Sequence, residues 1–68
     1  MKNNPNVDRL KLARRQINRL KTMSRNLTDM SIDWDGLDGG MEADFEALAS
    51  TVEAQIKTHN EMIDEWRQ

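Results

Sequence analysis

The stretch "SIDWDGLDGGME", residues 31–42, separates two long segments of helix-forming sequence. It contains all three glycines of the chain, three aspartates and a tryptophan. Glycine permits backbone conformations that end a helix, and aspartate favours turns and helix caps. Because no glycine or proline interrupts the sequence between residues 6 and 30, we expect one helix before the loop and a second one after it.

The first predicted helix covers about residues 6–30. Asn6 is its candidate N-cap, and Asp8 places a negative charge in its first turn, where the helix dipole favours it. Apolar or small residues then recur at alternating steps of three and four, a pattern typical of a packed helical stripe. This stripe consists of Leu10, Ala13, Ile17, Leu20, Ser24 and Leu27.

The second predicted helix covers about residues 41–67, after an acidic, glycine-rich loop at 31–40. A matching stripe runs along it, with the same alternation of three and four. Its members are Phe45, Leu48, Val52, Gln55, His59, Met62 and Trp66.

Folding the chain back at the loop brings the two stripes into register, with Leu27 opposite Phe45 and Leu20 opposite Val52. Charge supports the same pairing. Residues 1–27 contain eight basic residues and one acidic residue, whereas residues 28–68 contain eleven acidic and two basic residues. The sequence therefore predicts a single all-α domain, 1–68, that forms an antiparallel two-helix hairpin resembling a coiled coil.

A second apolar stripe on the later helix lies beside the first and makes its apolar surface wider than one partner helix covers. It consists of Ala49, Val52, Ile56, His59, Ile63 and Trp66. We interpret this stripe as an interface with another molecule. The simplest partner is a second copy, so that a homodimer forms a four-helix bundle.

The loop also matches the spacing of an EF-hand calcium loop, with Asp33, Asp35 and Glu42 at ligand positions. Two positions depart from that pattern: Ser31 replaces the first aspartate, and Asp38 replaces an aliphatic residue. The alternative is an acidic turn in which Asp38 caps the second helix. We favour the turn and keep calcium binding as an alternative hypothesis.

Trp34, in the same loop, has two interpretations. It can cover the end of the hairpin together with Ile32, Leu37 and Met41, or it can be an exposed anchor for a partner protein, because tryptophan is enriched at binding hot spots. We favour the first.

A nucleic-acid-binding surface is the main alternative function, because phosphate contacts need only clustered cations. The candidate residues are Arg14, Arg15, Arg19, Lys21 and Arg25. Against it stand the sequence pI of about 5.2 and the acidic second helix.

The sequence contains no recognisable catalytic constellation and suggests no cofactor. His59, the single histidine, lies in the predicted stripe beside Gln55, where polar residues commonly set register. No apolar run is long enough to span a membrane, and the lack of cysteine fits a cytoplasmic protein.

We therefore expect a non-catalytic protein–protein interaction module, an adaptor or regulator, that forms a homodimer and binds a further protein partner. Small acidic helical proteins of this kind are common among phage and mobile-element accessory proteins, which is an analogy at the level of fold.

Overall fold

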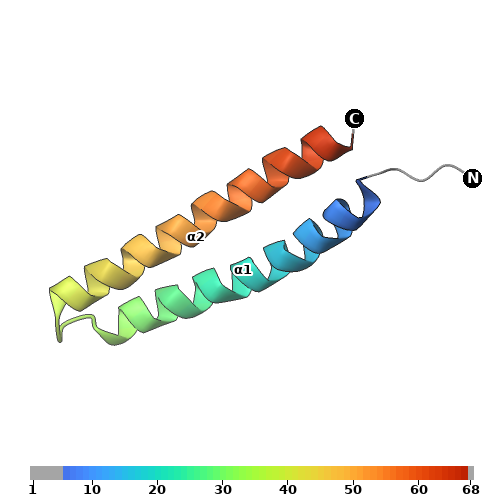
Figure 1. Cartoon of the computed structure of the whole chain (residues 1–68). Coiled ribbons are helices and arrows are strands. Elements are labelled where there is room, and N and C mark those ends of the chain that lie inside the picture. The colour runs from blue at the N-terminus through green and yellow to red at the C-terminus, as the bar shows by residue number, and fades with distance from the viewer. Residues whose placement is uncertain (1–5, 68) are drawn as a thin grey trace, which may run out of the picture.

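A computed structural model describes residues 6–67 and confirms the predicted all-α hairpin (Figure 1). It has two helices, α1 (Val7–Asp33) and α2 (Gly39–Trp66), which run antiparallel and pack along their whole length. The 28 residues of α2 span about 42 Å at about 1.5 Å per residue, and the two helices lie side by side in a single layer. The molecule is therefore a slab one helix thick, with two broad sides.

The loop is shorter than the predicted range 31–40 because both helices extend into it. α1 continues to Asp33, and α2 begins at Gly39. The reason is Asp38, which has the extended backbone of an N-cap residue, and whose carboxylate accepts a hydrogen bond from the Met41 N–H at 3.1 Å. This confirms the capping role predicted for Asp38 and places Gly39 and Gly40 in the first helical turn.

A tight turn at 34–38 reverses the chain. The Trp34 carbonyl accepts hydrogen bonds from the N–H groups of Leu37 (2.9 Å) and Asp38 (3.0 Å). Gly36 has a φ of 80°, a conformation that L side chains adopt only with strain. The turn therefore requires glycine at this position, whereas the other two glycines have ordinary helical backbone.

At the opposite end of the hairpin, Asn6 links the two helices. Asn6 occupies the N-cap position of α1 as predicted, but its side chain makes no capping bond. Instead its amide Nδ2 donates to the Trp66 carbonyl at 3.2 Å, which links the start of α1 to the end of α2.

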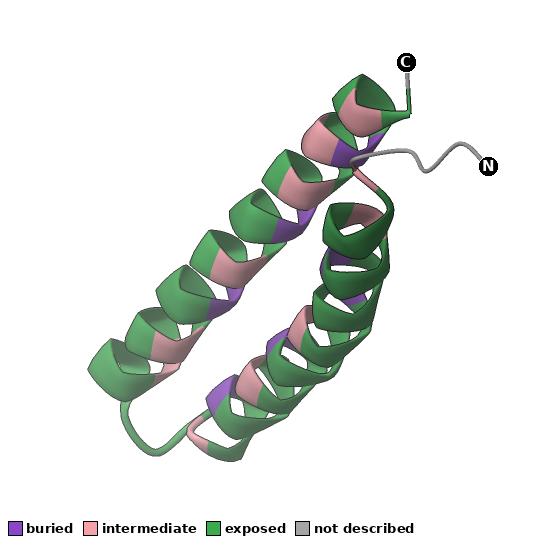
Figure 2. Ribbon diagram, turned by 45° about the vertical axis from the view of Figure 1, so that its right-hand side comes forward, coloured by how far each residue is buried: buried purple, intermediate pink, exposed green. Residues whose placement is uncertain are grey.

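The seam between the helices contains the buried residues of both, which face each other in Figure 2. They are Ala13, Ile17, Ser24 and Ser31 from α1 and Ala49, Ile56 and Ile63 from α2. The stripe predicted for α1 is correct. The one predicted for α2 is displaced by one residue, because Leu48 is 51% exposed while Ala49 lies in the seam.

The residues of the seam are smallest near the turn. Ser31 is the most buried residue of the seam, at 3% exposure, and its Oγ donates to the Glu42 carbonyl at 3.1 Å. Ser24 and Ala49 come next along the seam, followed by Ile17 and Ile56, and then by Ala13 and Ile63 toward the open end. A five-residue turn holds the helices close together, so only small side chains fit beside it.

Opposite charges do not pair across the seam as predicted. Within residues 6–67 the one ion pair joins Arg67 and Asp64, three residues apart on α2, at 3.8 Å. Both side chains are exposed, so this pair contributes little to stability. Apolar packing at the seam therefore holds the hairpin together.

We expect Ile56→Ala to destabilise the hairpin strongly, because the substitution leaves a cavity in a thin seam. The expected loss is about 2–5 kcal/mol of a total that is about 3–10 kcal/mol for a chain of this size. Thr51→Ala, at an exposed position of the same helix, should change the free energy of unfolding by less than about 0.5 kcal/mol. Urea unfolding followed by circular dichroism at one protein concentration measures both; equal effects would contradict this seam.

Two glycine substitutions should have opposite effects. Gly36→Ala forces a side chain into the left-handed region and should cost about 1–2 kcal/mol. Gly39→Ala meets no atom within 4 Å in ordinary helical backbone and should stabilise by about 0.4–1 kcal/mol. Thermal unfolding of the two variants provides the test, and a shift of the same sign in both would show that the turn is built differently.

Candidate functional site

The two broad sides of the slab differ in chemistry. One side, called the polar face, carries charged and hydroxyl or amide side chains around three shallow grooves. Its residues are Arg14, Asn18, Lys21, Arg25 and Thr28 from α1 and Glu46, Ser50, Glu53, Asn60, Asp64 and Arg67 from α2.

The other side, called the apolar face, is formed by side chains that recur at steps of three, four and seven on both helices. Its apolar residues are Leu12, Leu20, Met23, Leu27, Met30 and Trp34 from α1 and Met41, Phe45, Leu48, Val52, Met62 and Trp66 from α2. These include every methionine and every aromatic residue among residues 6–67.

Much of this surface is exposed to water. Leu12, Met23 and Leu48 are about half exposed, and the side chains between them are half-buried. No side chain of the described residues is less than 2% exposed, so the hairpin has a seam but no interior. Methionine side chains are flexible and polarisable, which suits such a surface.

A polar layer crosses the apolar face and connects the two helices. The His59 Nε2 lies 3.1 Å from the Gln16 Oε1 on α1. Its Nδ1 lies 3.0 Å from the Gln55 side-chain amide nitrogen and 3.0 Å from the Gln55 carbonyl oxygen. With the proton on Nε2, the imidazole donates across the seam to Gln16 and accepts from the Gln55 amide.

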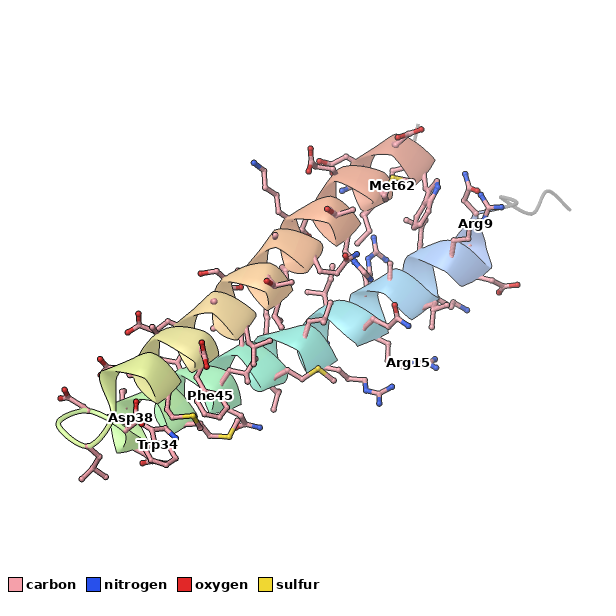
Figure 3. The ribbon with its side chains drawn as sticks, turned by 60° about the vertical axis from the view of Figure 1, so that its left-hand side comes forward. Arg9, Arg15, Trp34, Asp38, Phe45 and Met62 are labelled. Atoms are coloured by element: carbon pink, nitrogen blue, oxygen red, sulfur yellow. The ribbon has the colours of Figure 1, made fainter. Side chains whose placement is uncertain are left out.

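This polar layer divides the apolar face into unequal halves. The half next to the turn, called the apolar half, contains Trp34 and Phe45 (Figure 3) together with leucine and methionine side chains of both helices. The half next to the open end mixes Leu12 and Met62 with the polar layer and with Arg9, whose guanidinium carbon lies 5.9 Å from the centre of the Trp66 ring.

The residues predicted as an intermolecular interface lie partly inside the hairpin. Ala49, Ile56 and Ile63 are buried against α1 and cannot contact a partner while the hairpin is intact. This corrects the sequence-based interpretation. Val52, His59 and Trp66 are half-buried at the boundary between the seam and the apolar face. The two stripes of α2 have therefore exchanged roles, because its first stripe, not its second, supplies the open surface.

Trp34 does not form the predicted cover with its neighbours in the loop. Ile32 and Leu37 are 62% and 77% exposed, so they pack against little. Trp34 itself is half-buried and lies at the turn end of the apolar face (Figure 3). It therefore extends that face to the end of the hairpin.

The cations predicted to bind nucleic acid do not form one patch. Arg14, Lys21 and Arg25 lie on the polar face, where Asp29 and Glu53 share the groove of the last two.

The remaining two cations point elsewhere. Arg15 points away from α2 (Figure 3), and Arg19 borders the apolar face next to Leu20. One nucleic-acid backbone cannot contact cations on the polar face, Arg15 and Arg19 at the same time, because they point in three different directions. The geometry thus gives the nucleic-acid hypothesis no support.

The predicted calcium ligands are also dispersed. Asp33 belongs to α1, Asp35 to the turn and Glu42 to α2, while the Ser31 hydroxyl is engaged with the Glu42 carbonyl. Among residues 6–67 no three acidic, histidine or cysteine side chains lie close enough to hold a metal ion. The loop is instead a capped helical turn.

Comparisons with known proteins do not assign a function. No protein-family model, curated protein or solved structure matches the chain. Within residues 6–67 neither helix is both long and apolar enough to cross a membrane. The uncovered apolar face is therefore the feature from which a function must be argued.

Calcium should leave the stability of the protein unchanged, because no preformed cage exists in the turn. We expect the same melting temperature in millimolar calcium chloride and in a chelator. Magnesium at equal concentration controls for ionic strength. A rise in melting temperature with calcium that Asp35→Asn removes would restore the calcium hypothesis.

Proposed function

We propose that the chain is a non-catalytic protein–protein interaction module, a small adaptor or regulator, whose binding surface is the apolar face. The observation that carries this proposal is the thickness of the fold. A domain normally buries its apolar surface between two layers of secondary structure, and this hairpin supplies one. The apolar face is therefore the side on which a second layer has to pack.

A second copy of the chain supplies that layer with a matching shape. Two hairpins stacked through their apolar faces make a coiled-coil-like four-helix bundle, in which the half-exposed leucines and methionines enter a common core. Two helices side by side, each about 42 Å long and about 10 Å across, make a broad side of roughly 800 Å². A stable interface takes about 800 Å² from each partner, so one face is large enough for a dimer.

The composition of the apolar face also favours self-association over a strongly charged partner. It contains no acidic residue, and its nearest cations are Arg9, within the open-end half, and Arg19, at its border. The polar face remains free in such a dimer. A further protein partner of the adaptor would then contact the polar face or the exposed side chains of the turn.

Leu48→Glu tests this proposal, because it places a charge in the centre of the apolar half of the face. We expect the wild-type protein to have the mass of a dimer by light scattering on a sizing column. Leu48→Glu should weaken the dimer at least 100-fold, since burying an unpaired carboxylate costs several kcal/mol.

Ala54→Glu is the matched control, with the same new charge on the same helix but away from the apolar face. It should keep the dimer mass, and both variants should keep their helical circular dichroism. A wild-type monomer at every concentration, or a Leu48→Glu dimer as stable as that of Ala54→Glu, would refute self-association.

A further inference from the structure

Two hairpins can stack their apolar faces with two-fold symmetry in two ways. If the two-fold axis runs along the helices, both turns lie at the same end and α1 of one copy faces α2 of the other. If the axis runs across the helices, the turns lie at opposite ends and each helix faces its own copy. These arrangements bury the same face but bring different side chains together. The choice between them rests on the dimer proposed above.

Charge distinguishes the two arrangements. Within its bounds α1 has seven basic and three acidic residues, whereas α2 has one basic and seven acidic residues. With the turns at the same end, every helix of the bundle lies between two neighbours of opposite charge. With the turns at opposite ends, the basic helix faces its basic copy and the acidic helix its acidic copy. Electrostatic complementarity across an interface sets orientation in this manner.

The polar layer independently favours the arrangement with both turns at the same end. Leu20 and Val52 lie at the midpoints of α1 and α2, while the polar layer lies one helical turn toward the open end. With the turns at opposite ends, Gln16 and Gln55 would pack against Met23 and Leu48 of the partner. An amide buried against apolar side chains loses hydrogen bonds to water and costs about 1–3 kcal/mol.

With the turns at the same end, the polar layer meets its own copy instead. The amides of Gln16 and Gln55 can then hydrogen-bond to those of the partner, and the apolar half of the face meets an apolar half. A single polar layer in an otherwise apolar helical interface specifies register and orientation by this mechanism.

A staggered dimer, in which only the two apolar halves overlap, would also keep polar and apolar groups apart. It would leave Leu12, Met62 and Trp66 exposed in both copies and bury about half of the available face. The full overlap buries more apolar surface at about 25 cal/mol per Å².

We propose that two copies of this chain pack through their apolar faces with both turns at the same end, α1 facing α2 of the partner, and that the layer of Gln16, Gln55 and His59 fixes this orientation. The dimer is then a four-helix bundle with alternating charge. One end of the bundle carries both Leu37 side chains, and the other carries Asn6 and Arg67 of both copies.

Distances between single spin labels test the orientation. The chain has no cysteine, so Leu37→Cys labels the turn and Arg67→Cys labels the open end without other changes. Ile32→Cys, also exposed, replaces the turn label if Leu37→Cys impairs folding. Pulsed dipolar spectroscopy should give separations below about 30 Å at both sites, because facing helices lie 8–10 Å apart.

Each other result overturns the proposal in a recognisable way. Separations above about 35 Å at both sites indicate turns at opposite ends, since the helices are about 42 Å long. A short separation at the turn with a long one at the open end indicates the staggered dimer. No dipolar signal together with a monomer mass refutes the proposed dimer itself, so the two failures are distinguishable.

The double substitution Gln16→Leu with Gln55→Leu tests the role of the polar layer. It should leave the dimer mass unchanged but add a second, long-distance population at both label sites. The matched control is Asn18→Leu with Asn60→Leu, which replaces two amides of the polar face and should keep one short population. If Gln16→Leu with Gln55→Leu also gives one short population, the polar layer does not set the orientation.

Discussion

Two helices in contact can cover only one stripe of each other. This limit determines both the buried seam of the molecule and its exposed apolar face. A helix of a globular domain usually buries a face at least 100° wide, which is more than a single seam provides. Here the seam buries the stripe that contains Ile17 on α1 and the stripe that contains Ile56 on α2. The neighbouring apolar stripe of each helix remains exposed to water. The exposed stripes of the two helices lie on the same broad side of the molecule because the helices run antiparallel. The apolar face is thus a geometric consequence of a two-helix fold in which each helix has a wider apolar surface than its partner covers.

The antiparallel hairpin could be predicted from the sequence because its signals do not depend on packing details. All glycines lie between two uninterrupted heptad patterns, and the capping role of Asp38 follows from its chemistry. The helix limits were less predictable. Gly39 and Gly40 have low helix propensity, yet the Asp38 cap and the first turn of α2 outweigh it. Local propensity alone therefore misplaces the ends of the loop.

The sequence does not show which stripe of α2 packs against α1, because two adjacent stripes have the same alternation of three and four. Val52, His59 and Trp66 belong to both predicted stripes. The stripes differ in the residues between these, which are Leu48, Gln55 and Met62 in one and Ala49, Ile56 and Ile63 in the other. Size would have been the decisive signal. The short turn brings the helices together beside Ser24 and Ser31, where Ala49 fits and leucine does not. The side chains predicted to bind calcium are near in sequence, but they belong to α1, the turn and α2 and do not converge on one point.

Apolar contact is non-directional, so a face made only of leucine and methionine would hold two hairpins together without deciding how they align. Direction has to come from groups whose misplacement is costly. In the proposed dimer those groups are the opposite charges of the two helices and the hydrogen-bonded set of Gln16, Gln55 and His59. The polar layer lies away from the midpoint of the hairpin, and this asymmetry gives it orienting power. At the midpoint it would meet its copy in either arrangement, whereas one turn away it meets its copy in only one.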